Sequence, residues 1–183
     1  MQVRLTMRDG DVTRVETWAG PLRTREGRDL GQVSATESAA YLLGVAARGS
    51  AGASAKAILP AILADSAATW PALLTIARDT ATRSHATRQE SMFWLSRFAA
   101  SAVAGRRELF DDGSDARDAE GPEDLKRHAV FVLSQLPHRS GVPALLDIAR
   151  SNPDLKVRGQ ALFWLGQSGD PRAIALFESV LRA

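Results

Sequence analysis

The chain has 183 residues, of which 45% are hydrophobic and 24% are charged. A chain of this size and composition forms one domain or two small ones and needs no disulfide or metal to fold. The absence of cysteine excludes thiolate-bound zinc, iron–sulfur clusters and thiol nucleophiles. No apolar run of about 18 residues and no secretory signal pattern is present, so we expect a soluble protein. Cytoplasm and periplasm are not distinguished.

The charge is unevenly distributed along the chain. The formal net charge is +2, but residues 111–124 hold seven acidic residues and one basic residue, Arg117. This acidic run therefore carries −6 and the rest of the chain +8. So modest a basic surface does not indicate nucleic-acid binding. The acidic run also lacks the ligand spacing of a calcium loop, so we expect a solvated loop between repeats.

Residues 2–18 predict a β-hairpin around the turn Asp9-Gly10. A simple two-residue loop would place Arg14 opposite Leu5, whereas one bulged residue brings Val15 opposite Leu5. We therefore expect a bulge near the turn. An isolated hairpin is only marginally stable in water, so it should pack on helices or pair with further strands.

The remainder of the chain has the apolar spacing and capping residues of helices. Helices are predicted near 35–48, 53–64, 69–79, 85–101, 123–136, 141–150, 154–168 and 171–182, with a further short helix possible in principle at 103–110. Ser34 and Thr87 each precede a glutamate by three positions, which is the pattern of a capping box. Asn152 and Asp170 each precede a proline and are predicted helix N-caps. We therefore divide the chain into a hairpin with its linker, residues 1–33, and a helical region, residues 34–183.

The helical region contains internal repeats. Residues 88–96 (RQESMFWLS), 126–134 (KRHAVFVLS) and 158–166 (RGQALFWLG) share one pattern. The octapeptides 71–78 (PALLTIAR) and 143–150 (PALLDIAR) are identical at seven of eight positions, and residues 173–182 match them more loosely. Repeats of 30 to 40 residues that each form a helical hairpin are typical of an α-solenoid.

One motif carries a family resemblance. Residues 157–173 (VRGQALFWLGQSGDPRA) resemble a HEAT repeat, most closely the short bacterial type shared with relatives of phycobilin lyases. The resemblance is strong over 154–183, good over 123–150 and partial over 34–102. It implies a mainly α fold, an α-solenoid of about four HEAT-like hairpins preceded by the short β-hairpin. It also implies the usual role of such arrays as scaffolds and adaptors.

Six residues toward the ends of the second helices form the candidate binding site. They are Thr75, Arg78, Asp147, Arg150, Ser179 and Arg182. Each arginine lies three positions after its neighbour in this set, so both lie on one side of the helix. Stacked repeats would align them in two polar rows on the concave face, where arginine can bind carboxylates. Alternatively, each arginine only complements the dipole of its helix end.

Other conspicuous residues have structural interpretations. Arg88, Lys126 and Arg158 open the first helices, and the HEAT resemblance implies that such a residue bonds an aspartate in an adjacent turn, most clearly Asp170. The repeated Trp94 and Trp164 are flanked by apolar residues and should pack in the core. The histidines His85, His128 and His138 form no metal-binding motif, so we expect no metal and no cofactor.

We therefore expect a non-enzymatic scaffold or adaptor that binds a protein or peptide, which the arginines suggest is acidic. The first alternative is a DNA-binding protein like the HEAT-like DNA glycosylases, although the charge distribution disfavours nucleic acid as a partner. A second is a chromophore lyase, suggested only by the family name. We expect no membrane association, and the oligomeric state and the identity of the partner stay open.

Overall fold

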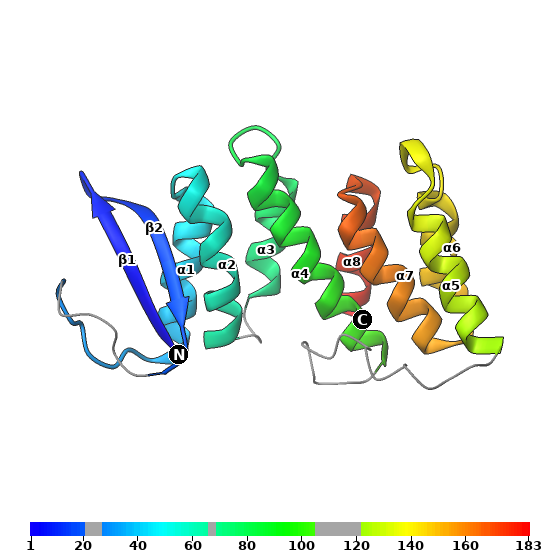
Figure 1. Ribbon diagram of the computed structural model, residues 1–183, viewed down its shortest axis with the longest axis horizontal. Helices are drawn as coiled ribbons and strands as arrows, with labels where there is room; N and C mark the ends of the chain where they lie inside the picture. The colour runs from blue at the N-terminus through cyan, green and yellow to red at the C-terminus, as the bar shows by residue number, and fades with distance from the viewer. Residues whose placement is uncertain (21–26, 66–68, 105–121) are drawn as a thin grey trace. The chain divides into compact units, whose positions relative to one another are not determined.

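The structure is a computed structural model that describes residues 1–20, 27–65, 69–104 and 122–183 (Figure 1). It is mainly helical, with a short antiparallel two-stranded sheet near the N-terminus, which confirms the predicted fold class. The chain forms two compact units, residues 1–91 and residues 92–183. Residues 103 and 104 of the predicted short helix belong to a longer helix, and its remainder lies outside the described residues. The acidic loop at 111–121 lies outside them as well.

The N-terminal hairpin has the predicted bulge. Strands β1 (Gln2–Arg8) and β2 (Asp11–Trp18) pair antiparallel, with Leu5 opposite Val15. The register shifts beside Thr6 and leaves one extra residue in β2. The turn residues Asp9 and Gly10 both have positive φ, 53° and 88°, as a tight two-residue hairpin turn requires.

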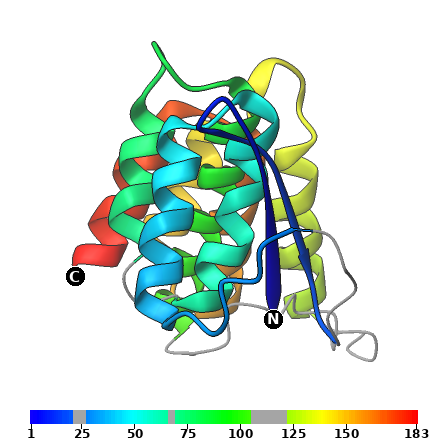
Figure 2. The ribbon, with the colours of Figure 1, turned by 90° about the vertical axis from the view of Figure 1, so that its left-hand side faces the viewer.

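The bulge decides which side chains of β2 face the helices. Val12 and Val15 are three residues apart, and a regular strand would direct them to opposite faces. The extra residue reverses the alternation, so both are buried. Strand β2 packs on helix α2 (Ala51–Ala64), and Figure 2 shows the hairpin lying in front of the helices of this unit. The hairpin is therefore stabilised by helix packing, the first of the two predicted possibilities.

Besides the hairpin, the described part of the first unit contains three whole helices and the start of a fourth, α4. Helix α1 (Ala35–Arg48) packs extensively on α2 and also contacts α3 (Trp70–Arg78). The Ser34 hydroxyl accepts a hydrogen bond from the Glu37 backbone N–H, as the capping box predicts. It also donates to the Glu37 carboxylate at 2.6 Å. Helix α2 begins two residues before its predicted start.

The remaining helices are close to their predicted ranges. Helix α4 (His85–Ala104) begins in the first unit and continues into the second. It is followed by α5 (Pro122–Ser134), the short 3-10 helix η2 (Pro137–Arg139), α6 (Val142–Ser151), α7 (Leu155–Ser168) and α8 (Pro171–Arg182). Helix α7 packs on α5, α6 and α8. This contact pattern is that of two antiparallel helical hairpins stacked side by side.

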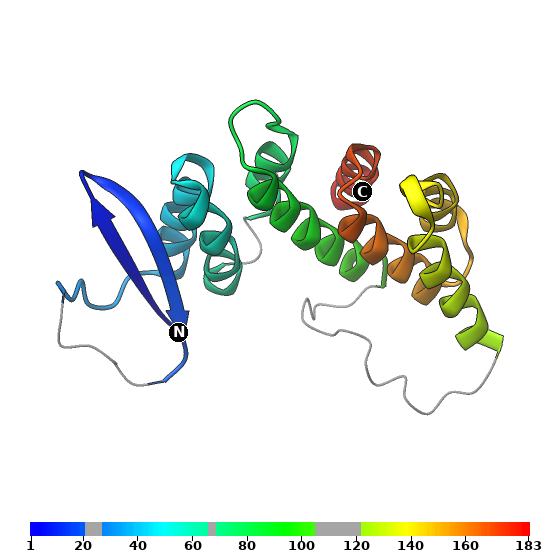
Figure 3. The same cartoon turned by 45° about the horizontal axis from the view of Figure 1, so that its top comes forward.

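The helices of the second unit are not stacked in chain order. The ring centroid of Phe163 on α7 lies 6.2 Å from that of Phe93 on α4, and the ring of Trp164 lies 5.3 Å from that of Phe131 on α5. Helix α7 therefore lies between α4 and α5, as Figure 3 shows. A Cβ atom on Gly166 would lie only 2.2 Å from the Ser96 hydroxyl oxygen, so α7 and α4 approach closely at this glycine. The last helical hairpin in the sequence is thus an internal element of the stack.

Two predicted caps were wrong. Helix α4 is capped by Ser84, whose hydroxyl accepts from the Thr87 backbone N–H at 3.2 Å, so Thr87 is an internal helical residue. Helix α7 is capped by Asp154, which accepts from the N–H groups of Lys156 and Val157. Asn152 instead accepts from the Asp154 N–H and closes the preceding turn. In both places a second capping residue lay within three positions, and local pattern alone did not decide between them.

Candidate functional site

The second unit brings two of the three candidate pairs onto neighbouring helices. Asp147 and Arg150 lie on α6, Ser179 and Arg182 lie on α8, and α6 contacts α8. All four residues are exposed. They occupy matching positions of the two helices, because buried residues such as Leu145 and Phe177 also correspond in the repeat. The structure therefore provides two solvent-facing arginines at equivalent positions of adjacent helices.

Each of these arginines has an acidic neighbour on its own helix. The Arg150 Nη1 atom lies 3.9 Å from Asp147 Oδ1, with both side chains more than half exposed. The Arg182 Nε atom donates to Glu178 Oε1 at 3.0 Å. Ser179 does not join this pair, because its hydroxyl donates to the Leu176 carbonyl. The pair of Arg150 and Asp147 is exposed on both sides, and such pairs contribute about 0–1 kcal/mol, so an external carboxylate can compete for Arg150.

The third candidate pair belongs to the first unit. Thr75 and Arg78 lie on α3 and are exposed. The Thr75 hydroxyl donates to the Pro71 carbonyl of its own helix at 3.2 Å, which is a common local bond for threonine within helices. The alignment of this pair with the pairs on α6 and α8 stays a prediction.

The predicted bond between the basic column (Arg88, Lys126 and Arg158) and an aspartate of an adjacent turn is not found at Asp170, the clearest candidate. Arg158 Nε donates to the Ala149 carbonyl at 3.1 Å and so satisfies a carbonyl near the end of α6. Asp170 is the N-cap of α8, as predicted, and its partner is Arg172. Arg88 is half-buried, and among the described residues nothing accepts a hydrogen bond from its Nε atom. The column of basic residues therefore does not form one regular ladder.

Asp170 is the centre of a polar cluster, and it is the one member of the cluster that the sequence pattern indicates. Its side chain is 7% exposed and accepts from the backbone N–H, Nε and Nη2 of Arg172 at 2.9 to 3.0 Å. The Arg172 side-chain bond is the main cause that lowers the pKa of the Asp170 carboxyl; burial opposes it, and the charge of Arg139 adds to the lowering. Arg139 comes from the turn between α5 and α6, and no sequence motif marks it.

The repeated tryptophans are packing residues, as predicted. Trp94 is buried. Trp164 is half-buried, and its ring contacts those of Phe131 and Phe163 with centroids 5.3 and 5.1 Å away. Both residues therefore stabilise helix packing, which leaves the exposed arginines as the candidate binding groups.

Residues of the kinds that bind metals are dispersed in the described ranges. His85, His128 and His138 are all exposed. Within 1–20, 27–65, 69–104 and 126–183, no three histidine, aspartate or glutamate side chains are grouped as metal ligands. No helix in this part of the chain is both long and apolar enough to cross a membrane.

The comparison with known families identifies the repeats. Residues 115–183, which include α5 to α8, match the family model for HEAT repeats. Over these residues the chain consists of HEAT repeats. No curated protein and no solved structure matches it. HEAT repeats commonly serve as scaffolds for protein interactions and are typically non-enzymatic.

Proposed function

We propose that this HEAT-repeat protein is a non-enzymatic scaffold or adaptor that binds an acidic protein or peptide through its second helices. The supporting observation is the exposure of Arg150 and Arg182 at matching positions of the neighbouring helices α6 and α8. Thr75 and Arg78 on α3 would supply the same pair of groups in the first unit. A guanidinium group binds carboxylates in a bidentate manner, which gives both affinity and orientation.

The weak ion pair on α6 is compatible with exchange. At 3.9 Å, the contact between Arg150 and Asp147 is longer than a charge-assisted hydrogen bond, and water reaches both groups. A partner carboxylate can therefore replace Asp147 with little loss of stability. In the second unit the neighbouring helices α6 and α8 each present such an arginine, so an extended acidic segment could contact both in turn.

The test compares the wild-type chain with the triple variant Arg78→Gln, Arg150→Gln and Arg182→Gln. The probe is a fluorescent twelve-residue peptide rich in glutamate, with a lysine-rich peptide of equal length as the specificity control. We expect the variant to bind the acidic probe at least tenfold more weakly while its melting temperature stays within about 2 °C of wild type. The variant Arg14→Gln is the matched control, because it removes an exposed, ion-paired arginine from the hairpin instead.

Two results would contradict the proposal. If the arginines only complement helix dipoles, the triple variant should lose a few tenths to about 1 kcal/mol of stability per site and bind the probe unchanged. If the protein instead binds duplex DNA with a steep salt dependence, the DNA-binding alternative would be favoured.

A further inference from the structure

The turn between α5 and α6 has an unusual backbone. His138 and Arg139 both have positive φ, 54° and 57°, although neither is glycine. Residues other than glycine rarely adopt this left-handed backbone conformation, and two consecutive residues that do so are less common still. Such strain persists only where the surrounding structure holds it, and it is found at binding sites more often than elsewhere. It fixes the direction in which Arg139 leaves the turn.

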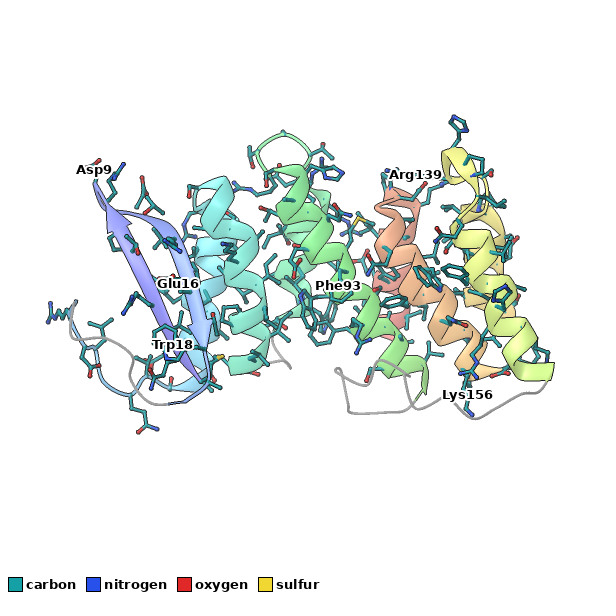
Figure 4. The ribbon with its side chains drawn as sticks, viewed as in Figure 1. Asp9, Glu16, Trp18, Phe93, Arg139 and Lys156 are labelled. Carbon is teal, nitrogen blue, oxygen red and sulfur yellow. The ribbon has the colours of Figure 1, made fainter. Side chains whose placement is uncertain are left out.

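Arg139 extends toward the turn between α7 and α8. Its Nη2 atom lies 3.9 Å from the position that a Cβ atom would take on Gly169, so the guanidinium group lies beside that glycine. Figure 4 shows the labelled Arg139 side chain near the turn between α7 and α8. The neighbouring residue is Asp170, and the charge of Arg139 is close enough to contribute to its lowered pKa. The two turns therefore place Arg139, Asp170 and Arg172 together, all within the second unit.

The cluster contains two positively charged arginines and one aspartate, and only one of the arginines is hydrogen-bonded to the aspartate. Both oxygens of Asp170 are already occupied by Arg172, through its backbone N–H and Nε on one and Nη2 on the other. Within the described ranges, the side chain of Arg139 has no hydrogen bond and no ion pair, and it is exposed. Two guanidinium groups thus lie near one carboxylate, and a single positive charge with its N–H donors remains available to a ligand.

We propose that the turns α5–α6 and α7–α8 form a binding site for one carboxylate group of an acidic protein segment. Arg139 would bind the carboxylate, and Arg172, which stays more than half exposed while bonded to Asp170, would add its remaining N–H donors. Asp170 favours a singly charged ligand, because its negative charge repels the second charge of a phosphate dianion. This site uses neither Arg150 nor Arg182, so it does not depend on the proposed function.

The experiment follows the backbone amide signals of the full chain by NMR while hexaglutamate is added. We expect the signals of Arg139, Gly169 and Arg172 to shift, and binding to weaken at least tenfold in Arg139→Gln. Arg139→Lys should bind with intermediate affinity, since it keeps the charge and loses the bidentate geometry. Arg14→Gln is the matched control, because it removes an exposed arginine from the hairpin, outside the second unit, and should bind as wild type.

Four results would overturn this site. Equal binding of hexaglutamate by wild type and Arg139→Gln would show that Arg139 does not contact the ligand. A lowered melting temperature of Arg139→Gln with unchanged binding would assign Arg139 a structural role. Tighter binding of inorganic phosphate than of hexaglutamate would exclude the carboxylate preference. Loss of binding only in Arg150→Gln with Arg182→Gln would support the second-helix surface and contradict this one.

Discussion

The octapeptides on α3 and α6 differ at one position of eight, and they belong to different compact units. Their helices are nevertheless alike. Each has a proline at its second residue, buries both leucines and the second alanine, and carries an exposed arginine in its last turn. The repeated residues therefore determine helix position and buried face in both units, because these depend on local pattern and on one apolar surface to pack against.

The two helices differ in the loops that come after them. After α3, Asp79 accepts hydrogen bonds from the backbone N–H groups of Ala81 and Thr82 and from the side chains of Thr82 and Arg83. After α6, a short turn leads to Asp154, which caps α7. The residues outside the repeat therefore decide the loop and the next helix, even where the repeat itself is almost unchanged.

The largest expected effect comes from removing a shared core residue. Leu73 and Leu145 occupy the same position of the octapeptide and are 0% and 1% exposed. Changing either to alanine should lower the free energy of unfolding by about 2–5 kcal/mol, because each leaves a cavity. Native-state hydrogen exchange should show Leu73→Ala weakening protection mainly in residues 1–91 and Leu145→Ala mainly in residues 92–183. Equal loss across both units for either variant would show that they unfold together.

Substitutions of two glycines on α7 test the contact between α7 and α4, which the repeat pattern does not specify. A Cβ atom on Gly166 would lie within 2.4 Å of the Ser96 side chain, whereas one on Gly159 would meet only Ala100 at 3.9 Å. Gly166→Ala should therefore destabilise the protein by about 1–3 kcal/mol through overpacking. Gly159→Ala should stabilise it by up to about 1 kcal/mol through helix propensity. Chemical denaturation measures both, and a stabilising Gly166→Ala would contradict the close approach of α4 and α7.

Most of the fold follows from features that are local in the sequence. The bulge in the hairpin was predicted because only one register brings Val15 opposite Leu5. The helices were predicted from apolar spacing, prolines and caps, and their ends differ from the prediction by only a few residues. The order of the helices in the second unit was not predictable in this way. Phe93, Phe131 and Phe163 occupy equivalent positions, so the pattern does not specify which of them meet.

The candidate site was predicted less completely than the fold. Exposure of the six residues followed from helical periodicity, and the structure agrees. Hydrogen-bond partners did not follow, because Thr75 and Ser179 bond to their own helices and Arg182 pairs with Glu178. Arg139 carried no signal, since its position depends on two left-handed residues, His138 and Arg139 itself, and neither is glycine. Such details depend on tertiary contacts between turns that are distant in the sequence.

A smaller effect concerns the loop after α3 and depends on pH. The Thr82 hydroxyl is the main cause that lowers the pKa of Asp79 to about 2, with backbone N–H groups and Arg83 adding to it. Because the folded pKa lies below the unfolded value of 3.8, this carboxylate stabilises the fold above about pH 4 and loses that effect as the pH falls toward 2. The stability difference between wild type and Asp79→Asn should therefore be greatest above pH 4 and shrink on acidification. A constant difference across this range, in melts recorded between pH 2 and 7, would be inconsistent with a lowered pKa.

The smallest effect on stability comes from the one position at which the octapeptides differ. Asp147→Thr converts the segment on α6 into the sequence found on α3 and removes an exposed ion pair 3.9 Å long. The free energy of unfolding should change by no more than about 0.5 kcal/mol, because such pairs contribute little. Binding of the glutamate-rich peptide should nevertheless become tighter, since Arg150 loses its competing carboxylate and the surface loses a negative charge. Fluorescence titration at low and moderate salt measures this, with Thr75→Asp as the reciprocal variant, expected to bind more weakly. Unchanged affinity in both variants would mean that the polar residue beside each arginine has no part in recognition. The segments around α3 and α6 would then differ only in the loops that follow these helices.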